Sequence, residues 1–275
     1  YLKFGCPAIG APEKDWRNEM LKRKTVAILL ACFLLALCFS SCAKKEVQYV
    51  VLSEPLAEEA FCIGFRKEDN ALCQAVEEAL VEMKEDGTLS EIDKKWFGKD
   101  VSIVDAANIT QDASDDSLQK ILDKGQLVLG LDDSFPPMGY RDNENAIVGY
   151  DIDLATEVCQ RLGVELVLQP ISWTAKEKEI NSGNIDCIWN GFSTNPEREE
   201  QLCMSMPYLN NRQVIVTTQE LYDDGLDSTQ ALAGRTLVLQ GGSTAVDALS
   251  QFPELSASLE GGAAVEVDTY VLAMF

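Results

Sequence analysis

From residue 49 onward, short apolar runs alternate with segments in which apolar residues recur every three or four positions. The first pattern predicts buried strands, and the second predicts helices with one apolar face. The expected helices span residues 70–86, 89–96, 117–123, 152–162, 176–182, 196–202, 229–233 and 244–251. The expected strands span residues 49–52, 61–65, 126–131, 165–170, 185–190, 214–218, 235–239 and 264–267.

The regular alternation of these elements indicates the α/β class. Strands that alternate with helices form a doubly wound parallel sheet with helices on both faces. In such sheets, ligands bind beyond the carboxyl ends of the strands, where the loops converge. The candidate chemistry is therefore sought in the loops that follow strands.

The first 42 residues have the features of an export signal. Met20 begins a basic stretch, an apolar run covers residues 25–39, and small residues precede Cys42. A basic start, a short apolar run and small residues before a break are typical of a secretory signal peptide. An N-terminal membrane anchor is the alternative, but the run is shorter than the roughly 20 residues that a spanning helix needs. We expect residues 1–19 to lie upstream of the true start at Met20.

Composition limits the chemistry that remains. The chain has 275 residues, 23 Lys and Arg against 45 Asp and Glu, a net charge of -22, and no histidine. Nucleic acids and anionic membranes are poor partners for such a chain, and catalysis or metal binding through histidine is excluded. An acidic binding protein remains, or an enzyme that uses carboxylate, Lys, Tyr or Cys chemistry.

The cysteines indicate no disulfide framework and no zinc site. Outside the signal region there are five, an odd number without metal-ligand spacing. Most lie in apolar stretches, where a free cysteine behaves as a small hydrophobic residue. We expect these five to pack in the core: Cys62, Cys73, Cys159, Cys187 and Cys203.

Three loops after predicted strands hold the candidate binding residues. The first, residues 131–140, contains Asp132 and Phe135 beside two prolines. A carboxylate and an aromatic ring on a rigid loop favour a ligand site at the end of the preceding strand. The alternative is a solvated acidic turn with Phe135 in the core.

The second loop leads from a strand into a helix and contains Asn190, Gly191, Ser193 and Arg198. Arg198 lies in the first helical turn, where a cation is electrostatically unfavourable. Its planar guanidinium can hold a carboxylate through two parallel hydrogen bonds. The alternative is a surface arginine that pairs with its acidic neighbours Glu197, Glu199 and Glu200.

The third loop has two glycines, Gly241 and Gly242, followed by Ser243 and Thr244 at a predicted helix start. Backbone N–H groups in such a turn can bind an anion. The loop lacks the Gly-Lys-Ser/Thr ending of a P-loop. Together with Arg198 it supplies a second group for a ligand carboxylate.

These loops, in this order and spacing, resemble the extracellular solute-binding proteins of polar-amino-acid ABC importers (family 3). The matching segments are residues 126–137, 148–155, 181–198, 207–208 and 232–236. The resemblance implies a two-lobed, type II periplasmic-binding-protein-like fold with a hinge, no catalytic residues, no cofactor and no metal. It also implies a monomer that binds a free amino acid in the cleft between the lobes and passes it to permease subunits.

The resemblance also assigns roles within the cleft. Arg198, the backbone near Ser193, and Thr244 would bind the ligand carboxylate, while the Gly191 carbonyl and the Ser193 hydroxyl would accept from the ammonium. Phe135 and Trp173 would enclose the aliphatic part, and Asp132 would contact a polar or cationic group. The ligand-binding set expected is Asp132, Phe135, Trp173, Asn190, Gly191, Ser193, Arg198, Ser243 and Thr244. Cys42 resembles the lipidated cysteine of bacterial lipoproteins, which implies a lipid anchor at the extracellular face of the membrane or in the periplasm.

The order of the segments departs from the family. Residues 49–98, which include Lys95-Trp96-Phe97-Gly98, resemble the family's C-terminal end but precede the rest, and the family would continue beyond Phe275. A circular permutant is favoured over a partial copy fused to a second copy. The expected organisation is an upstream extension 1–19, a lipoprotein signal peptide 20–41, a tether plus lobe-two strand 42–61, the family's C-terminal part of lobe one 62–98, a linker 99–116, the main part of lobe one 117–215 and an incomplete lobe two 216–275.

Three other functions remain open. An enzyme on the same fold, dehydratase-like or lytic, would use a carboxylate in the cleft. A ligand-sensing ectodomain would need a membrane helix and a signalling module. A nonfunctional rearranged remnant would fail to unfold cooperatively.

Overall fold

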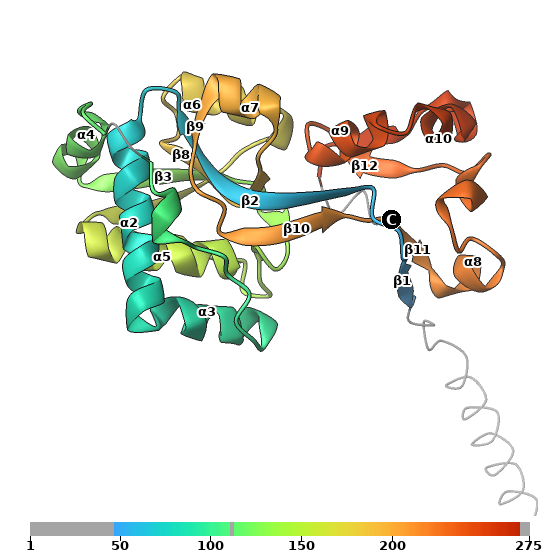
Figure 1. Ribbon diagram of the computed structural model, residues 1–275, viewed down its shortest axis with the longest axis horizontal. Helices are drawn as coiled ribbons and strands as arrows, with labels where there is room; N and C mark the ends of the chain where they lie inside the picture. The colour runs from blue at the N-terminus through green and yellow to red at the C-terminus, as the bar shows by residue number, and fades with distance from the viewer. Residues whose placement is uncertain (1–46, 111–112, 270–275) are drawn as a thin grey trace, which may run out of the picture. The chain divides into compact units, whose positions relative to one another are not determined.

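The computed structural model describes residues 47–110 and 113–269 (Figure 1). The expected upstream extension, signal peptide and lipidation residue Cys42 lie outside the described residues. The described residues from Gln48 onward belong to one compact unit. Within the described ranges, none of the helices is both long and apolar enough to cross a membrane.

The helices and strands alternate along most of this unit. The α-helices are α2 (Asn70–Asp86), α3 (Thr88–Phe97), α4 (Ser117–Lys124), α5 (Tyr150–Leu162), α6 (Lys176–Asn181), α7 (Pro196–Gln201), α8 (Gln219–Asp223), α9 (Thr244–Ser250) and α10 (Pro253–Ser258). The strands are β1 (Tyr49–Val51), β2 (Ala57–Arg66), β3 (Gln126–Leu131), β4 (Ser134–Phe135), β5 (Gly139–Arg141), β6 (Ile147–Val148), β7 (Glu165–Pro170), β8 (Cys187–Ser193), β9 (Leu202–Met204), β10 (Leu209–Gln213), β11 (Val216–Thr218), β12 (Val238–Gln240) and β13 (Val265–Val267). Single 3₁₀ turns lie at Ala106–Asn108, Trp173–Ala175, Thr229–Leu232 and Glu260–Gly262.

The predicted bounds of α2, β3 and β7 are confirmed. The predicted helix at 229–233 is wrong, because the chain makes only a 3₁₀ turn there. The small β4–β5–β6 sheet and strand β10 were not predicted. β10 reads Leu-Asn-Asn-Arg-Gln, which has no apolar alternation. Several of its polar residues line the cavity described below. The sequence of β10 therefore lacks the alternation of apolar and polar residues by which strands are recognised.

The largest sheet is mixed, so the expectation of an all-parallel sheet is wrong. Its strand order is β10-β2-β8-β3-β7, with β9 also paired to β2. β3 is parallel to β7 and β8, as the alternation predicts. β2 is antiparallel to β8, β9 and β10. Because β2 comes from a distant, earlier part of the chain, no helical crossover fixes it parallel to its neighbours.

Both faces of this sheet are buried. Alternate residues of each strand point to opposite faces, so each strand contributes to both cores. In β3, Leu127, Leu129 and Leu131 pack into the core cluster that includes the apolar face of α2 and α5. Val128 faces the other side, where it joins Ile180 of α6 in a second cluster. Figure 1 shows α2 and α5 on one side of the sheet and α6 and α7 on the other. This layering confirms the predicted doubly wound architecture.

The five predicted core cysteines are confirmed as buried, free thiols. Residues 99–110, the start of the expected linker, pack on the sheet domain. Val104 is buried in the main core, and the Asp93 carboxylate accepts hydrogen bonds from the backbone N–H groups of Val101 and Ser102.

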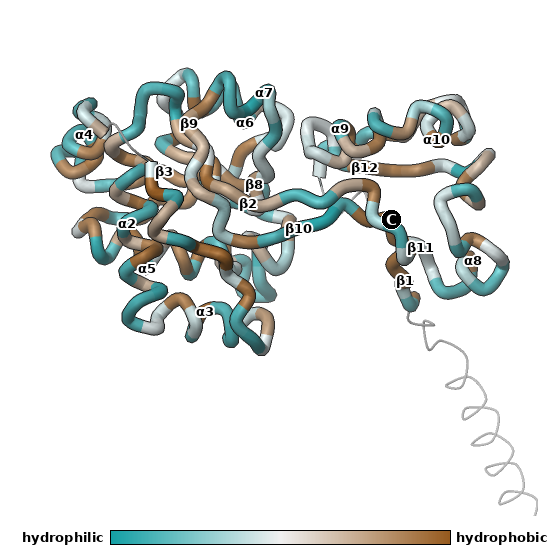
Figure 2. Tube along the Cα trace, in the orientation of Figure 1, coloured by the Kyte–Doolittle hydropathy of each residue, from teal (hydrophilic) through white to brown (hydrophobic). Residues whose placement is uncertain are grey.

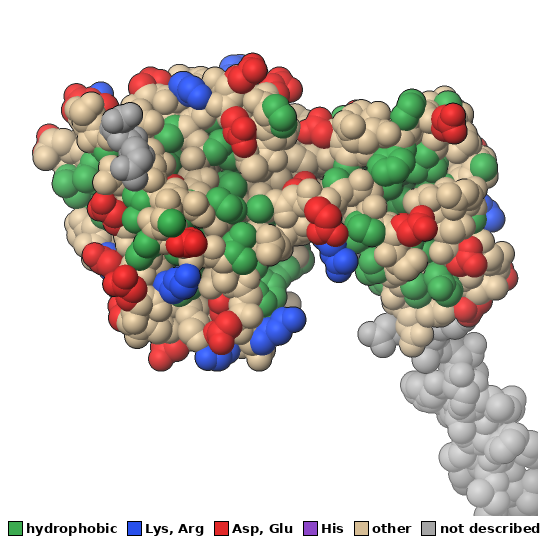
Figure 3. Space-filling view, in the orientation of Figure 1, with side chains coloured by type: hydrophobic (Ala, Val, Ile, Leu, Met, Phe, Trp, Pro, Cys, Tyr) green, Lys and Arg blue, Asp and Glu red, His purple; other side chains and the backbone are tan. Residues whose placement is uncertain are grey.

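Strands β1, β11, β12 and β13 form a smaller lobe, which we call lobe two. β1 pairs with β11, and β12 pairs in parallel with β13. Their apolar residues form a separate core cluster of seven buried side chains: Leu52, Ile215, Leu226, Leu232, Leu239, Leu249 and Leu259. Figure 2 shows β12 in brown, in keeping with its hydrophobic sequence. Acidic side chains are spread over the face visible in Figure 3 rather than gathered in one patch.

We predict that Asp93→Ala lowers the free energy of unfolding by about 3 kcal/mol or more. The fully buried Asp93 carboxylate also accepts from the Tyr150 hydroxyl at 2.8 Å, so its removal leaves several buried donors without a partner. Urea unfolding followed by circular dichroism measures the change. The control is Glu85→Ala on an exposed position of α2. Equal stabilities of the two variants would contradict the role given to Asp93.

Candidate functional site

A cavity of about 550 Å³ lies among the ends of β2, β8 and β10 and the residues of lobe two. This volume is within the range typical of small-molecule sites. The structure places all nine sequence-predicted residues on its wall: Asp132, Phe135, Trp173, Asn190, Gly191, Ser193, Arg198, Ser243 and Thr244. Their placement in one cavity is an observation, whereas their roles toward a ligand stay predictions.

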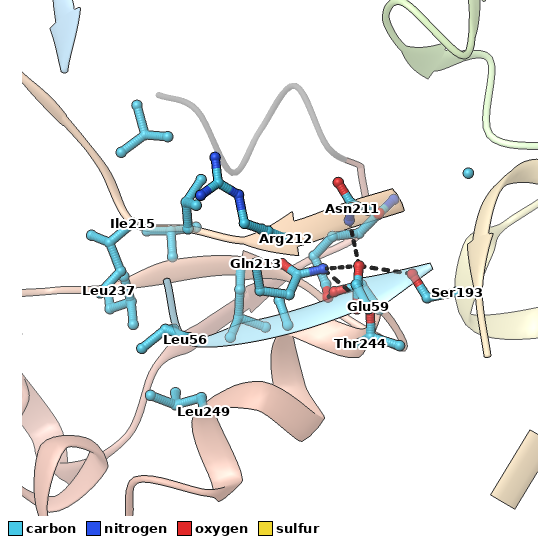
Figure 4. Close-up of a pocket in the computed structure, with 18 of the residues that line it drawn as sticks. Leu56, Glu59, Ser193, Asn211, Arg212, Gln213, Ile215, Leu237, Thr244 and Leu249 are labelled. Carbon is cyan, nitrogen blue, oxygen red and sulfur yellow. Dashed lines mark hydrogen bonds between the residues drawn. The ribbon is translucent and has the colours of Figure 1, made fainter. Parts of the chain in front are cut away.

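The cavity has a polar end and an apolar end. The apolar end is lined by side chains of the lobe-two core, among them Leu56, Ile215, Leu237 and Leu249, which Figure 4 labels. The polar end contains the predicted residues together with Glu59, Asn211 and Gln213. The groups that can orient a charged ligand are therefore concentrated at one end.

Arg198 is buried at the polar end, with 7% of its surface exposed. Its Nη1 donates to the Ser193 carbonyl at 2.6 Å, and its Nη2 donates to the Gly242 carbonyl of lobe two at 3.1 Å. The guanidinium also lies 4.3 Å from the centre of the Phe192 ring. The alternative of a surface arginine paired with its sequence neighbours is wrong, since its nearest carboxylate is Glu177 at 3.9 Å.

A second buried cation, Lys176, lies beside this arginine and was not predicted. Its Nζ donates to the same Gly242 carbonyl at 2.8 Å and lies 3.0 Å from Glu177. Burial lowers the pKa of Lys176, and the nearby Arg198 charge lowers it further, while Glu177 opposes both effects. Burial likewise lowers the pKa of Arg198, opposed by the carboxylate charges of Glu177, Asp247 and Glu59. Two cations thus share one neutral carbonyl oxygen.

Glu59 brings a carboxylate into the polar end. Its Oε1 accepts from the Ser193 hydroxyl at 2.8 Å, from Gln213 Nε2 at 2.9 Å and from Asn211 Nδ2 (Figure 4). Gln213 Nε2 also donates to the Thr244 hydroxyl of lobe two at 3.1 Å. Glu59 therefore contacts Ser193 directly and Thr244 through Gln213.

Gly191 is held in a backbone conformation that favours glycine, with a φ of 57°. A Cβ at this position would lie 2.6 Å from an atom of the Phe135 ring, so glycine also permits the ring to approach. The Gly191 N–H donates to the buried Asp151 carboxylate at 2.7 Å. Asp151 also accepts from the Tyr208 hydroxyl at 2.8 Å. Its carboxylate therefore links Gly191 of β8 to Tyr208.

Asp132 is buried and linked to lobe two. Its Oδ1 accepts from the Ser134 N–H and hydroxyl, and its Oδ2 accepts from Gln240 Nε2 at 2.6 Å. The Asp132 N–H donates to Asn190 Oδ1 at 3.2 Å. The alternative of a solvated acidic turn is therefore wrong.

The aromatic and serine residues of the set differ in how far they enter the cavity. Trp173 is 6% exposed and packs edge-on against Phe192, with its ring centre 6.0 Å away, so most of its surface belongs to the core. Phe135 is half-buried at the cavity wall. The Ser243 hydroxyl donates to the Gln240 carbonyl at 2.7 Å.

Glu59 and the residues of β10 were missed from sequence for the same reason. The predicted strand begins at Phe61, so Glu59 and the polar strand β10 fell outside any predicted element. Residues two apart on a strand share a face. Extending the strand from Phe61 back to Glu59 is the signal that places both on the cavity wall.

The arrangement suits a small molecule that carries both charges. The polar end has a buried guanidinium with charge-assisted donors on one side and carboxylates on the other. A ligand with a carboxylate and an ammonium group on one carbon offers a partner to each. A ligand with a single charge leaves one of these groups unpaired.

Comparisons with known proteins agree with this geometry. The profile of the bacterial extracellular solute-binding proteins, family 3, matches residues 11–99 and 127–247, more than half of the chain. The chain is 31% identical over 111 residues to the cyclohexadienyl dehydratase of Pseudomonas aeruginosa, covering 40% of this chain and 41% of that protein. It is 29% identical over 120 residues to the arginine-binding extracellular protein ArtP of Bacillus subtilis, covering 44% and 46%.

A solved structure shares the fold. An ABC uptake transporter substrate-binding protein from Streptococcus pneumoniae with bound histidine superposes with a TM-score of 0.55 at 34% identity, covering 58% of this chain and 65% of that chain. The matched region spans less than half the length of the curated relatives.

We predict that the free energy of unfolding falls as the pH rises from about 4 to about 7, through Asp151. Burial raises the pKa of Asp151 in the folded protein to about 7, whereas hydrogen bonds from Tyr208 and Gly191 oppose the shift. The unfolded carboxyl titrates near 3.9. Between these values the folded state holds a proton that the unfolded state has lost, so stability decreases as pH increases.

Urea unfolding at several pH values measures this effect. Asp151→Asn keeps the shape but cannot titrate, so the stability difference between wild type and variant changes by a few kcal/mol, on the order of 1.4 kcal/mol per pKa unit, across the window. Asp123→Asn, at an exposed position of α4, serves as the control. Parallel wild-type and Asp151→Asn curves would show that another group is responsible.

Proposed function

Since the chain belongs to the bacterial extracellular solute-binding proteins of family 3, we propose that it captures a free polar amino acid and delivers it to an ABC permease. The observation that carries this proposal is the buried Arg198 at the polar end of the cavity, where it contacts backbone carbonyls of both lobes. The permease as partner follows from the family, whose relatives include the arginine-binding protein ArtP.

The ligand carboxylate binds Arg198 in place of the Gly242 carbonyl. A carboxylate is a stronger acceptor for a guanidinium than a neutral carbonyl, and it can accept two parallel hydrogen bonds. The Thr244 hydroxyl, which lies on lobe two, adds a donor to the same group. The Gly242 carbonyl keeps its second donor, Lys176, when Arg198 turns to the ligand.

The ligand ammonium and side chain take the neighbouring positions. The Gly191 carbonyl and the Ser193 hydroxyl accept from the ammonium, and Phe135 and Trp173 pack on the aliphatic part. Asp132 contacts a polar or cationic end of the side chain. Its link to Gln240 supports this role, because a ligand there meets both lobes at once.

Ligand binding favours the arrangement in which both lobes contact the ligand. The contacts that already join them include Asp132 with Gln240, Gln213 with Thr244, the two cations with Gly242, and Asn195 Nδ2 with Asp247 Oδ2 at 2.7 Å. A ligand that adds contacts to each side shifts the population toward this closed form. The permease distinguishes loaded from empty protein by that difference.

The order of the chain fits a circular permutant. Strand β2, from the front segment, lies between β10 and β8 in the main sheet, and α2 packs on the same core as α5. The front segment thus occupies an interior place in the sheet, as one part of a single fold. A truncated first copy fused to a second copy is the alternative.

We further propose that Cys42 is the lipidated first residue of the mature protein and that residues 20–41 are its signal peptide. The basic start, apolar run and small residues of this segment support the proposal. The protein is then held at the outer face of the membrane, close to its permease.

A second candidate function is dehydration of a cyclohexadienyl compound. The 31% identity to a cyclohexadienyl dehydratase supports it, together with the Glu59 carboxylate in the cavity. Such a carboxyl can donate a proton to a leaving hydroxyl. Appearance of the aromatic product, followed by absorbance, would favour this candidate over the binding protein.

We predict that isothermal titration calorimetry with the twenty amino acids gives saturable binding of at least one polar amino acid. Arg198→Ala then weakens this binding by about 100-fold or more, because a buried charge pair is lost and its partner is left unpaired. Lys178→Ala, which removes an exposed cation of α6, leaves the affinity unchanged. Wild-type protein that binds none of the twenty would overturn the proposal.

We predict that Cys42→Ser releases the protein from the membrane fraction of expressing bacteria. Lipid attachment requires the thiol, whereas serine preserves the size of the side chain. Detergent phase partitioning with immunodetection measures the change, and Cys62→Ser at a buried position is the control. A Cys42→Ser variant that still partitions into detergent would refute the lipid anchor.

A further inference from the structure

We propose that Glu59 is the acceptor for the ligand's α-ammonium group. This inference rests on the proposed function and adds to it a residue that no sequence pattern identified. Glu59 lies on β2 with Phe61 on the same face of the strand, and both line the cavity. The neighbouring Glu58 faces the opposite side and is exposed.

The hydrogen bonds of Glu59 leave it able to accept a further donor. All three recorded donors, from Ser193, Asn211 and Gln213, reach the same oxygen, Oε1. Within residues 47–110 and 113–269, no hydrogen bond or ion pair is recorded for Oε2. A carboxylate oxygen offers about two lone pairs, so Oε2 can accept from an ammonium without breaking the existing contacts.

The other carboxylate of the cavity wall is less suited to this role. Asp132 uses both oxygens: Oδ1 accepts from Ser134, and Oδ2 accepts from Gln240 at 2.6 Å. An ammonium at Asp132 would share Oδ2 with Gln240, whose contact joins the two lobes, whereas Oε2 of Glu59 is shared with no other donor among the described residues.

The surroundings of Glu59 place it at the end of the cavity where the head group binds. Its partner Ser193 also provides the carbonyl that holds Arg198, at 2.6 Å from Nη1. Its partner Gln213 donates to Thr244, the proposed carboxylate donor from lobe two. The Glu59 charge is among those that stabilise the charged form of Arg198. In an amino acid, a single carbon separates the ammonium from the carboxylate, and Glu59 and Arg198 both contact Ser193, one at its hydroxyl and the other at its carbonyl.

Figure 4 shows the same arrangement, with Glu59 between Ser193 and Gln213 and near Thr244. The leucines labelled there belong to lobe two and offer no polar group to an ammonium. Glu59 therefore selects zwitterions over simple carboxylic acids, and Asp132 contacts the side chain of the ligand.

The test compares an amino acid with its des-amino analogue on wild-type and Glu59→Gln protein. The probe is the amino acid that binds wild type most tightly in the calorimetric panel. For arginine its partner is 5-guanidinopentanoate, and for histidine it is 3-(imidazol-4-yl)propanoate. Glutamine keeps an oxygen for Ser193, Asn211 and Gln213, and a cooperative thermal melt verifies that the variant folds.

We expect Glu59→Gln to weaken the amino acid by about 10- to 100-fold, the effect of losing a hydrogen bond between charged groups. Binding of the des-amino analogue stays equal or becomes tighter, because the variant removes a carboxylate that repels the carboxylate of the analogue. Glu58→Gln, which removes the same charge from the opposite face of β2, leaves both affinities unchanged.

Two outcomes overturn the inference while leaving the proposed function intact. Unchanged affinity of Glu59→Gln for the amino acid excludes contact with the ammonium. Equal weakening of the amino acid and its analogue shows that Glu59 only positions Ser193 and Gln213. Failure of wild type to bind any of the twenty amino acids is a different result, since it overturns the proposed function itself.

Discussion

The burial of Arg198 is the constraint on which the site depends. A guanidinium removed from water needs compensating acceptors, and here two backbone carbonyls, one aromatic face and the more distant Glu177 provide them. One of those carbonyls, Gly242, belongs to lobe two and is shared with Lys176. The charge is therefore satisfied by weak acceptors that a carboxylate can replace. These contacts allow the protein to fold with Arg198 buried, and they leave the guanidinium a favourable partner for an anionic group.

A second constraint is the interior position of β2. The strand pairs on both sides, with β10 and β8, and its N-terminal half carries Glu59 and Phe61 into the cavity. The same strand thus completes the core of the sheet and supplies part of the site. The packing of the sheet depends on where this strand lies rather than on its position along the chain.

The fold was largely accessible from sequence, and the reasons are specific. α2, β3 and β7 have strong periodicity and clear stop signals, so their bounds agree with the structure. The sheet's mixed direction was not accessible, because pairing of β2 with β8 joins residues more than a hundred positions apart. Gly191, which lies in β8 rather than in the predicted loop, and Arg198, in the first turn of α7, were found because their residue types are unusual for their local positions. Gln213 and Lys176 carry no such local signal, and only tertiary contacts place Gln213 on the cavity wall and Lys176 beside Arg198.

Under the proposed function, the ligand is smaller than the volume of the cavity alone would suggest. Much of its wall consists of lobe-two leucines that also belong to the core cluster, and apolar side chains there interact with one another as well as with any occupant. Discrimination comes instead from the polar end, where leaving a buried charge unpaired costs more than leaving apolar surface unfilled. Under the proposed function, Arg198 and Glu59 bind the head group of the ligand, and Asp132 with Gln240 contacts the far end of its side chain. The protein's net charge of -22 has little part in this choice, because a zwitterion responds to charges within a few ångströms rather than to a distant, screened field.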